Sequence, residues 1–284
     1  MVVRRDFRRN LPQKKVSVFS YWSITSLLII INAVLFILFL ILNKIFPGFF
    51  DFIAIKPLDI FGLDKLWTLI TSIFMHGGFF HLFVNMFSLF FLGSLTEKII
   101  GRRRFFWFYL IAGILGGLFF ISFAFIGNYI PRGDSVFGGV NDSAVGASGA
   151  IFGLLGLLAI LLPRKEIYLI VGPLIVLVLQ LVSNNLLPNI SGVIDTVSPI
   201  IIFLMVFSMF SMNSRFRKIA LPLRIPFWIA PIIAIIPLFI ISVFVKLPIG
   251  NTAHLGGLVA GLAYGAYLRS KYPQKVKMLN KMIR

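Results

Sequence analysis

Long apolar runs recur along this chain of 284 residues, separated by short polar or basic segments. Most runs are long enough to cross about 30 Å of hydrocarbon as a helix, at roughly 1.5 Å per residue. They are continuous rather than alternating, unlike the strands of a membrane β-barrel. The runs lie at about 21–42, 78–95, 105–127, 147–162, 167–187, 190–212, 225–246 and 251–268. The pattern therefore predicts an all-α polytopic membrane protein, a helical bundle with eight spans.

The polar segments indicate a single membrane domain, residues 21–269, between two basic tails at 1–20 and 270–284. Within this domain, residues 46–77 mix charged side chains with short apolar pieces. Such a mixture is typical of a loop that lies half in the membrane interface.

The formal net charge of +18 raises the alternative of nucleic-acid binding. The basic residues, however, do not gather on one soluble domain. With a cytoplasmic N-terminus, the outside retains only these of the 27 Lys and Arg residues: Lys44, Lys56, Lys65, Arg132 and Lys246. This asymmetry follows the positive-inside rule. We therefore predict a multi-pass protein of the plasma membrane with both termini cytoplasmic, in contact with the lipid bilayer and with no nucleic-acid partner.

Two of the apolar runs have a glycine-rich face. The first contains Ser148 among glycines at helical spacing: Gly146, Gly149, Gly153 and Gly156. The second contains His254, followed by a glycine at every fourth position: Gly257, Gly261 and Gly265. Because small residues let membrane helices approach closely, we expect these two helices to pack together. The predicted topology places Ser148 and His254 near the external ends of their helices.

A serine hydroxyl becomes a useful nucleophile when a base accepts its proton. Ser148 is the candidate nucleophile and His254 the candidate base. His81 and Asn85 are four residues apart and share a helical face, so both offer donors for a developing oxyanion. The backbone N–H of Ser148, at the start of its helix, adds another donor.

The three histidines, His76, His81 and His254, also raise the alternative of a metal site. The one carboxylate inside an apolar run is Asp195, which lies in a different run from all three histidines. Because the chain has no cysteine and no carboxylate beside these histidines, we expect no metal and no cofactor. A small transporter would require more charge within its spans.

The combined motifs resemble the rhomboid family of intramembrane serine proteases. The matching pieces are His81-Leu82-Phe83-Val84-Asn85, Glu97 to Gly101, Gly146-Ala147-Ser148-Gly149, Ala253-His254-Leu255-Gly256-Gly257 with Gly261, and Asn32 in the first run. The match covers about residues 21–165 and 250–268. The resemblance implies a dyad of Ser148 and His254 without a carboxylate, with His81, Asn85 and the Ser148 N–H forming the oxyanion hole. It also implies membrane-spanning protein substrates, cut near the external surface.

The sequence departs from the family pattern at two places. The first loop has Trp67-Thr68 where the family often has Trp-Arg. Three apolar runs, instead of one helix, separate the serine and histidine helices. We expect an inserted helix pair within 188–247, made of 190–212 and 225–246; the alternative is one re-entrant segment plus a tilted helix. The alternative function is a rhomboid-like pseudoenzyme that binds membrane helices without cleavage, although such proteins typically lack the serine or the histidine.

Overall fold

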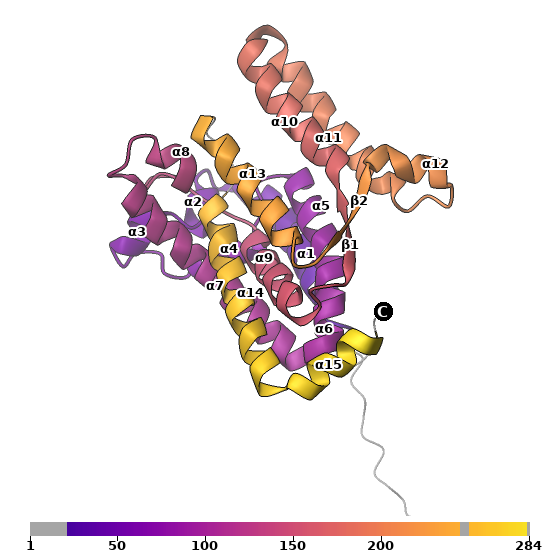
Figure 1. Ribbon diagram of the computed structural model, residues 1–284. Coiled ribbons are helices and arrows are strands. Elements are labelled where there is room, and N and C mark those ends of the chain that lie inside the picture. Colours follow the sequence, from indigo (N-terminus) through magenta and orange to yellow (C-terminus); the bar gives the residue numbers. More distant parts are fainter. Residues whose placement is uncertain (1–21, 245–249, 283–284) are drawn as a thin grey trace, which may run out of the picture.

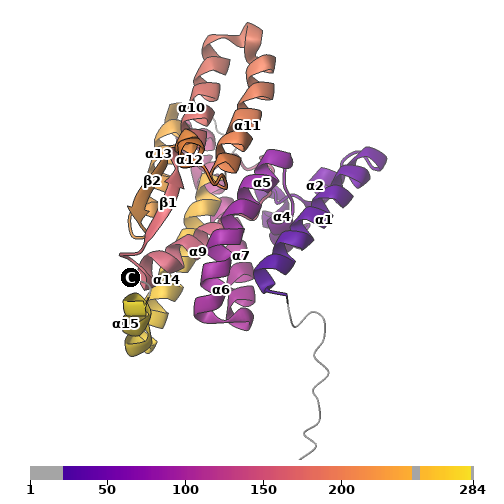
Figure 2. The same ribbon diagram turned by 90° about the vertical axis from the view of Figure 1, so that its right-hand side faces the viewer.

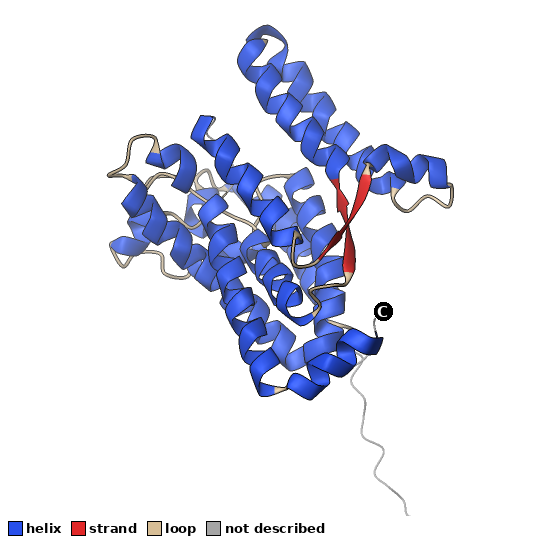
Figure 3. Ribbon diagram, viewed as in Figure 1, coloured by secondary structure: helices blue, strands red, loops and turns tan. Residues whose placement is uncertain are grey.

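The computed structural model describes residues 22–244 and 250–282 of the chain. The regular structure in these residues is helical apart from one two-stranded ribbon, which confirms the predicted all-α membrane fold class (Figure 3). Among the described residues, four helices are long and apolar enough to span a membrane: Ile24–Ile45, Phe79–Ile100, Arg102–Gly127 and Ser191–Ser208. Shorter apolar helices occupy Ser148–Leu161, Val171–Asn184 and Ala230–Phe244. The count of eight spans stays a prediction, and the tail at 1–20 lies outside the described residues.

Long helical segments lie side by side and form the bundle (Figures 1 and 2). They are α1 (Ile24–Ile45), the continuous segment α5 (Phe79–Ser88), η2 (Leu89–Gly93) and α6 (Ser94–Ile100), α7 (Arg102–Gly127), α9 (Ser148–Leu161), α13 (Ala230–Phe244) and α14 (Asn251–Lys271). The η2 piece is a single π-helical turn within the second segment. A last helix, α15 (Pro273–Met282), follows at the end of α14.

Short helices fill the connections at one end of the bundle. They are α2 (Phe49–Ile53), α3 (Pro57–Phe61), α4 (Thr68–Phe74) and α8 (Gly133–Phe137). The Trp67 indole donates a hydrogen bond of 2.8 Å to the Phe52 carbonyl, which ties the start of α4 to α2. Residues 46–77 are therefore an ordered arrangement of three short helices, and their position in the membrane interface stays a prediction.

The two glycine faces meet along the contact between α9 and α14. A Cβ atom added at Gly257 would overlap the carbonyl oxygen of Gly149, and one added at Gly261 would overlap that of Gly153. The matching order of these pairs shows that the two helices run parallel. Helix α7 packs closely against α14 beside this contact, because a Cβ at Gly116 would lie 2.8 Å from the Ala253 oxygen.

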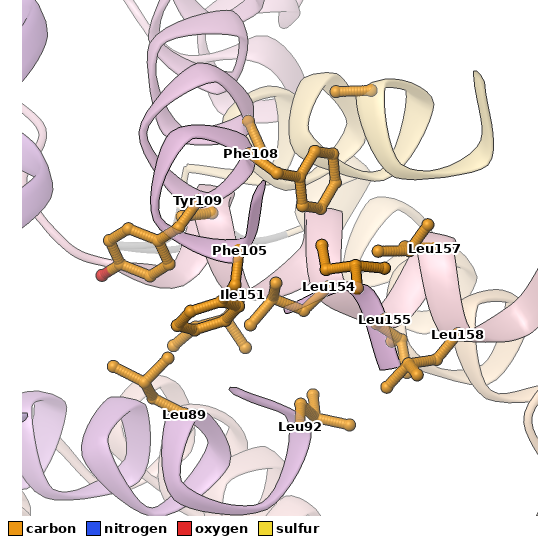
Figure 4. Close-up of a cluster of buried hydrophobic side chains, with 14 of the residues drawn as sticks. Leu89, Leu92, Phe105, Phe108, Tyr109, Ile151, Leu154, Leu155, Leu157 and Leu158 are labelled. Carbon is orange, nitrogen blue, oxygen red and sulfur yellow. The ribbon is translucent and has the colours of Figure 1, made fainter. Parts of the chain in front are cut away.

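Large apolar side chains complete the core around this glycine contact. Figure 4 shows leucines of α9 facing aromatic residues of α7 and leucines of the α5–α6 segment. Leu154, Leu157 and Leu158 of α9 are fully buried, as are Phe105 and Tyr109 of α7. Helix α9 is therefore the central helix of the bundle, and Ser148 is its first residue.

A buried carboxylate holds the N-terminus of α1. The Glu97 side chain accepts hydrogen bonds of 2.8 Å from the backbone N–H groups of Ile24 and Thr25, and one of 2.7 Å from the Thr25 hydroxyl. The first N–H groups of a helix have no partner within the helix, so an anion there is stabilising. Glu97 thereby joins α6 to α1.

The segment between α9 and α13 forms a separate hairpin that projects from the bundle (Figures 1 and 2). Its base is an antiparallel ribbon of β1 (Glu166–Ile170) and β2 (Pro222–Pro226). Beyond the ribbon lie α10 (Val171–Leu186), η3 (Pro188–Ile190), α11 (Ser191–Ser208), α12 (Ser214–Arg217) and η4 (Lys218–Ala220). The chain leaves and re-enters the bundle at one point, where the Phe227 N–H donates to the Lys165 carbonyl at 2.9 Å.

This arrangement corrects the expected insertion of a helix pair within 188–247. Helix α11 packs against α10, whereas α13 packs against α8, α9 and α14. The inserted unit is therefore 166–226, and α13 is the one helix between the serine and histidine helices in the bundle. The apolar run at 167–187 also begins as a strand. Pro222 and Pro226 are the first and last residues of its partner strand, positions where proline is tolerated.

Candidate active site

Ser148 and His254 lie side by side at the same end of α9 and α14. The Ser148 hydroxyl oxygen and the His254 Nε2 are 2.8 Å apart, within hydrogen-bond distance. The glycine contact explains this proximity, because a Cβ at Gly149 would lie 3.4 Å from the Ala253 oxygen. Ser148 precedes Gly149 and His254 follows Ala253 in the sequence, so the close approach of the two backbones brings the side chains of Ser148 and His254 together.

The His254 ring is buried and fixed by an aromatic neighbour. It is 7% exposed and stacks on Phe152, with ring centroids 4.3 Å apart and an interplanar angle of 9°. Phe152 lies one helical turn after Ser148 on α9. Phe152 was not among the residues predicted for the site; its spacing of four residues from Ser148 was the available signal.

The other ring nitrogen of His254, Nδ1, has no hydrogen-bond partner among the described residues. No carboxylate therefore orients this histidine in the described structure. If Nε2 accepts the serine proton, Nδ1 is the nitrogen that bears hydrogen in the neutral ring. The described contacts of the ring are its stacking on Phe152 and its approach to the Ser148 hydroxyl.

His81 and Asn85 are both on helix α5, and His81 lies close to the serine. A Cβ at Gly146 would lie 2.9 Å from the His81 Nε2 and 3.6 Å from the Ser148 hydroxyl oxygen, so Gly146 separates the two side chains. His81 is exposed, whereas Asn85 is 5% exposed. The Asn85 amide donates one hydrogen bond of 2.9 Å, to the His81 carbonyl in its own helix.

Gly146 does not belong to the helix contact predicted for it. It precedes α9, has a φ of 138°, and its N–H donates to the Ser72 carbonyl at 2.8 Å. A side chain there would be strained and would collide with His81. Its role is to let the loop pass between His81 and Ser148. Gly149, Gly153, Gly257 and Gly261 do lie at the helix contact.

Two other residues considered from the sequence are His76, which lies beside His81, and Asp195, which lies away from Ser148 and His254 in the inserted hairpin. His76 is completely buried, with its ring centroid 5.1 Å from that of His81 in an edge-on arrangement. Asp195 lies on α11 of the inserted hairpin, where it accepts hydrogen bonds of 2.7 Å from Gln180 and Asn184. No group of three metal-binding side chains occurs in the part of the chain that the structure describes.

Comparison with known proteins agrees with this architecture. The family model for the Rhomboid domain matches residues 63–200 and 197–271. RHOMBOID-like protein 12, mitochondrial, of Arabidopsis thaliana is 34% identical over 180 residues, which are 58% of this chain and 52% of that protein. Rhomboid protease GluP of Bacillus subtilis is 35% identical over 115 residues, 40% of this chain and 20% of GluP.

A third relative, Inactive RHOMBOID-like protein 8 of Arabidopsis thaliana, is 33% identical over 92 residues. That match covers 32% of this chain and 22% of the relative. This chain therefore spans about half the length of these relatives or less, and their names include both a protease and an inactive protein.

Proposed function

This chain belongs to the rhomboid family, and from that membership and the geometry of its serine and histidine we propose that it is an intramembrane serine protease. The observation that supports this most directly is the 2.8 Å contact between the Ser148 hydroxyl and the His254 Nε2. A nucleophile and a base within hydrogen-bond reach are the arrangement that acyl transfer requires. The substrates would be membrane-spanning proteins, cut near the external membrane surface.

In the first half of the reaction, the Ser148 oxygen attacks the carbonyl carbon of the scissile peptide. His254 Nε2 accepts the serine proton as the new C–O bond forms. The tetrahedral intermediate then collapses, the C–N bond breaks, and His254 donates that proton to the leaving amine. The product that remains is an ester between Ser148 and the N-terminal part of the substrate.

In the second half, a water molecule gives a proton to His254 and attacks the ester. The C–O bond to Ser148 breaks, the serine recovers its proton, and the carboxylic acid product leaves. In both halves, negative charge develops on the former carbonyl oxygen. The Ser148 N–H at the start of α9, His81 and the remaining amide hydrogen of Asn85 are the proposed donors to that oxygen.

The topology of the site is also a proposal. Ser148 and His254 lie near the ends of α9 and α14, and the opposite end of α14 contains Arg269 and Lys271. The positive-inside rule supports a cytoplasmic position for those cations and an external position for the site, with both termini in the cytoplasm. Protease protection of epitope-tagged termini in intact cells tests this orientation, and cell fractionation tests the plasma-membrane location.

The test of the protease proposal uses the purified protein in lipid vesicles with a panel of labelled transmembrane substrates. We expect cleavage by the wild-type protein and none by Ser148→Ala or His254→Ala. The two residues act as one unit, so the double variant should be no worse than either single variant. Equal cleavage by the wild-type protein and Ser148→Ala would overturn the proposal.

The relative named inactive favours a second candidate, a protein that binds membrane helices without cutting them. Labelling with a fluorophosphonate probe distinguishes the two. A protease should form a covalent adduct at Ser148 that disappears in His254→Ala. A binding protein should retain substrate helices in a pull-down experiment and show neither adduct nor cleavage.

A further inference from the structure

A basic pocket lies at the end of the bundle opposite Ser148. It has a volume of about 810 Å³ and is formed where the end of α9, the start of β1, the end of α14 and α15 come together. Five cationic side chains line it: Arg164, Lys165, Arg269, Lys277 and Lys281. Glu166 is the one acidic residue in the lining. Arg164 and Lys165 are more than 100 residues from Arg269, Lys277 and Lys281 in sequence, so the fold assembles this charge.

Within 22–244 and 250–282, none of these cations forms an ion pair. Among the described residues, the two ion pairs are Lys65 with Asp59 and Arg102 with Glu97, and neither involves the pocket. Five like charges around one pocket create a positive potential there, and an anion bound between them would be attracted to it. The pocket therefore has the charge of an anion site, and no described acidic side chain is paired with its cations.

The walls of the pocket also contain apolar and neutral polar groups. Ile160 and Leu162 line it from the end of α9, and Val276 lines it from α15. The Asn280 amide, also in the lining, donates 2.7 Å to the Leu161 carbonyl and so satisfies one acceptor at the negative end of α9. The site thus combines cationic side chains with an apolar wall that borders the buried core of the bundle.

The position along the bundle matches the depth of lipid headgroups. Helix α14 contains 21 residues and therefore extends about 31 Å, close to the hydrocarbon thickness. Arg269 lies in its last turn, and α15 follows immediately. Met278 and Met282 are exposed on α15 beside its lysines, which is typical of a helix at a membrane surface.

We propose that this pocket binds the phosphate group of an anionic phospholipid. Arg164, Arg269 and Lys277 supply charge-assisted hydrogen bonds to the phosphate oxygens, and the wall of Ile160 and Val276 receives the first part of an acyl chain. A bound lipid would join the base of the inserted hairpin to α14 and α15. The inference is independent of the proposed protease activity.

The experiment uses the full-length protein, stripped of lipid in an uncharged detergent. Its thermal unfolding is measured with added phosphatidylglycerol, with phosphatidylcholine of the same acyl chains, and with glycerol phosphate. We expect phosphatidylglycerol to raise the Tm by roughly 5 °C near saturation, because it binds the folded state. Phosphatidylcholine and glycerol phosphate should have little effect. An equal rise with glycerol phosphate would overturn the lipid assignment.

Two triple variants with the same loss of charge test the position of the site. Arg164→Gln with Arg269→Gln and Lys277→Gln should abolish the rise in Tm caused by phosphatidylglycerol. The matched control replaces exposed cations that do not line the pocket, Lys98→Gln with Arg103→Gln and Lys275→Gln, and should retain it. Equal loss in both variants would mean general attraction to anionic lipid and would overturn the pocket.

A further variant tests the same pocket even if the triple pocket variant does not fold. Glu166→Gln removes the one acidic side chain from the lining and leaves every cation in place. It should lower the phosphatidylglycerol concentration needed for half of the stabilisation by several-fold, and native mass spectrometry should show more retained lipid. Unchanged or weaker binding in Glu166→Gln would contradict a phosphate beside these cations.

Discussion

At the scale of single residues, the proposed chemistry depends on how two side chains are held. Ser148 is positioned by the start of α9, and His254 by stacking on Phe152 at 4.3 Å. No described carboxylate holds Nδ1 of this histidine. The orientation of the base therefore relies on packing, which makes the neighbouring aromatic ring and the oxyanion donors the informative positions to change.

The stack on Phe152 gives the first prediction. Phe152→Leu removes the flat surface beside the His254 ring, so the ring can rotate away from the serine. We expect kcat to fall on the order of tenfold to a hundredfold with KM little changed, because substrate binding is not affected. Phe152→Tyr retains the ring and should restore most of the rate. A rise in KM alone, or no rescue by tyrosine, would argue against this positioning role.

The oxyanion donors give the second prediction. Asn85→Ala should lower kcat by about a hundredfold, as for loss of one donor to the developing charge, with KM nearly constant. Ser88→Ala, a small change three residues along the same helix, is the control and should leave kcat unchanged. His81→Ala should behave like Asn85→Ala. If Asn85→Ala changed only KM, the assigned role would be wrong.

At the scale of elements, the contact between α9 and α14 depends on the absence of side chains. The third prediction is that Gly257→Ala destabilises the protein by about 1–3 kcal/mol and lowers activity, because the new Cβ overlaps the Gly149 backbone and separates the helices. The control is Gly192→Ala in α11, where nothing lies within 4 Å of an added Cβ. Thermal unfolding and cleavage rates measure both. Equal stability of the two variants would show that the α9–α14 contact tolerates a methyl group.

The junction of α1 and α6 gives the fourth prediction. Glu97→Ala leaves the N–H groups of Ile24 and Thr25 without their acceptor, and Thr25 is buried. We expect the free energy of unfolding to fall by about 3 kcal/mol, because unsatisfied buried donors are costly. Lys98→Ala changes the exposed neighbour and is the control. A similar small effect from both substitutions would contradict the anchoring role of Glu97.

At the scale of the whole molecule, the inserted hairpin contacts the bundle at its base, where Ile225 belongs to the main buried core, and along α5. The hairpin touches α5 through Phe203 on Phe83 and Phe210 on Phe87, with ring centroids 5.0 and 5.8 Å apart. These contacts lie on the outside of the bundle, where lipid is as apolar as the hairpin. The backbone ends of the insertion meet at the hydrogen bond between Lys165 and Phe227.

The fifth prediction is that residues 166–226 can be replaced by Asn-Gly without unfolding the bundle. A two-residue turn fits because Lys165 and Phe227 already face each other across a 2.9 Å hydrogen bond. The shortened protein should elute as one species, unfold cooperatively and still bind a fluorophosphonate at Ser148. Aggregation of the shortened protein, or loss of the adduct, would mean that the hairpin is part of the folding unit.

Much of this molecule was predictable because the relevant signals are local in the chain. The apolar runs located the helices of the bundle, and the glycine spacing identified the faces of α9 and α14 that meet. Ser148 and His254 followed as a candidate pair because few other polar groups accompany those faces. Their catalytic roles stay predictions, as do those of His81 and Asn85.

Other features depended on residues that meet only in the folded chain. Glu97 binds the backbone of Thr25, 72 residues away, and hydropathy contains no sign of that contact. Phe152 lay in the apolar run beside Ser148, but its stacking on His254 required the two helices to be placed. The basic pocket also exists only because α15 returns beneath the end of α9.

Composition and spacing alone therefore determined the membrane class, the bundle helices and the candidate serine–histidine pair, since each follows from the period of side chains along one segment. The tertiary structure decided where the insertion begins and ends. The hydropathy of the run at 167–187 does not distinguish strand from helix at its start, so the sequence predicts a helix where residues 167–170 belong to β1. They become a strand because Pro222–Pro226 supply a partner edge, and that pairing is a property of two distant segments rather than of either one.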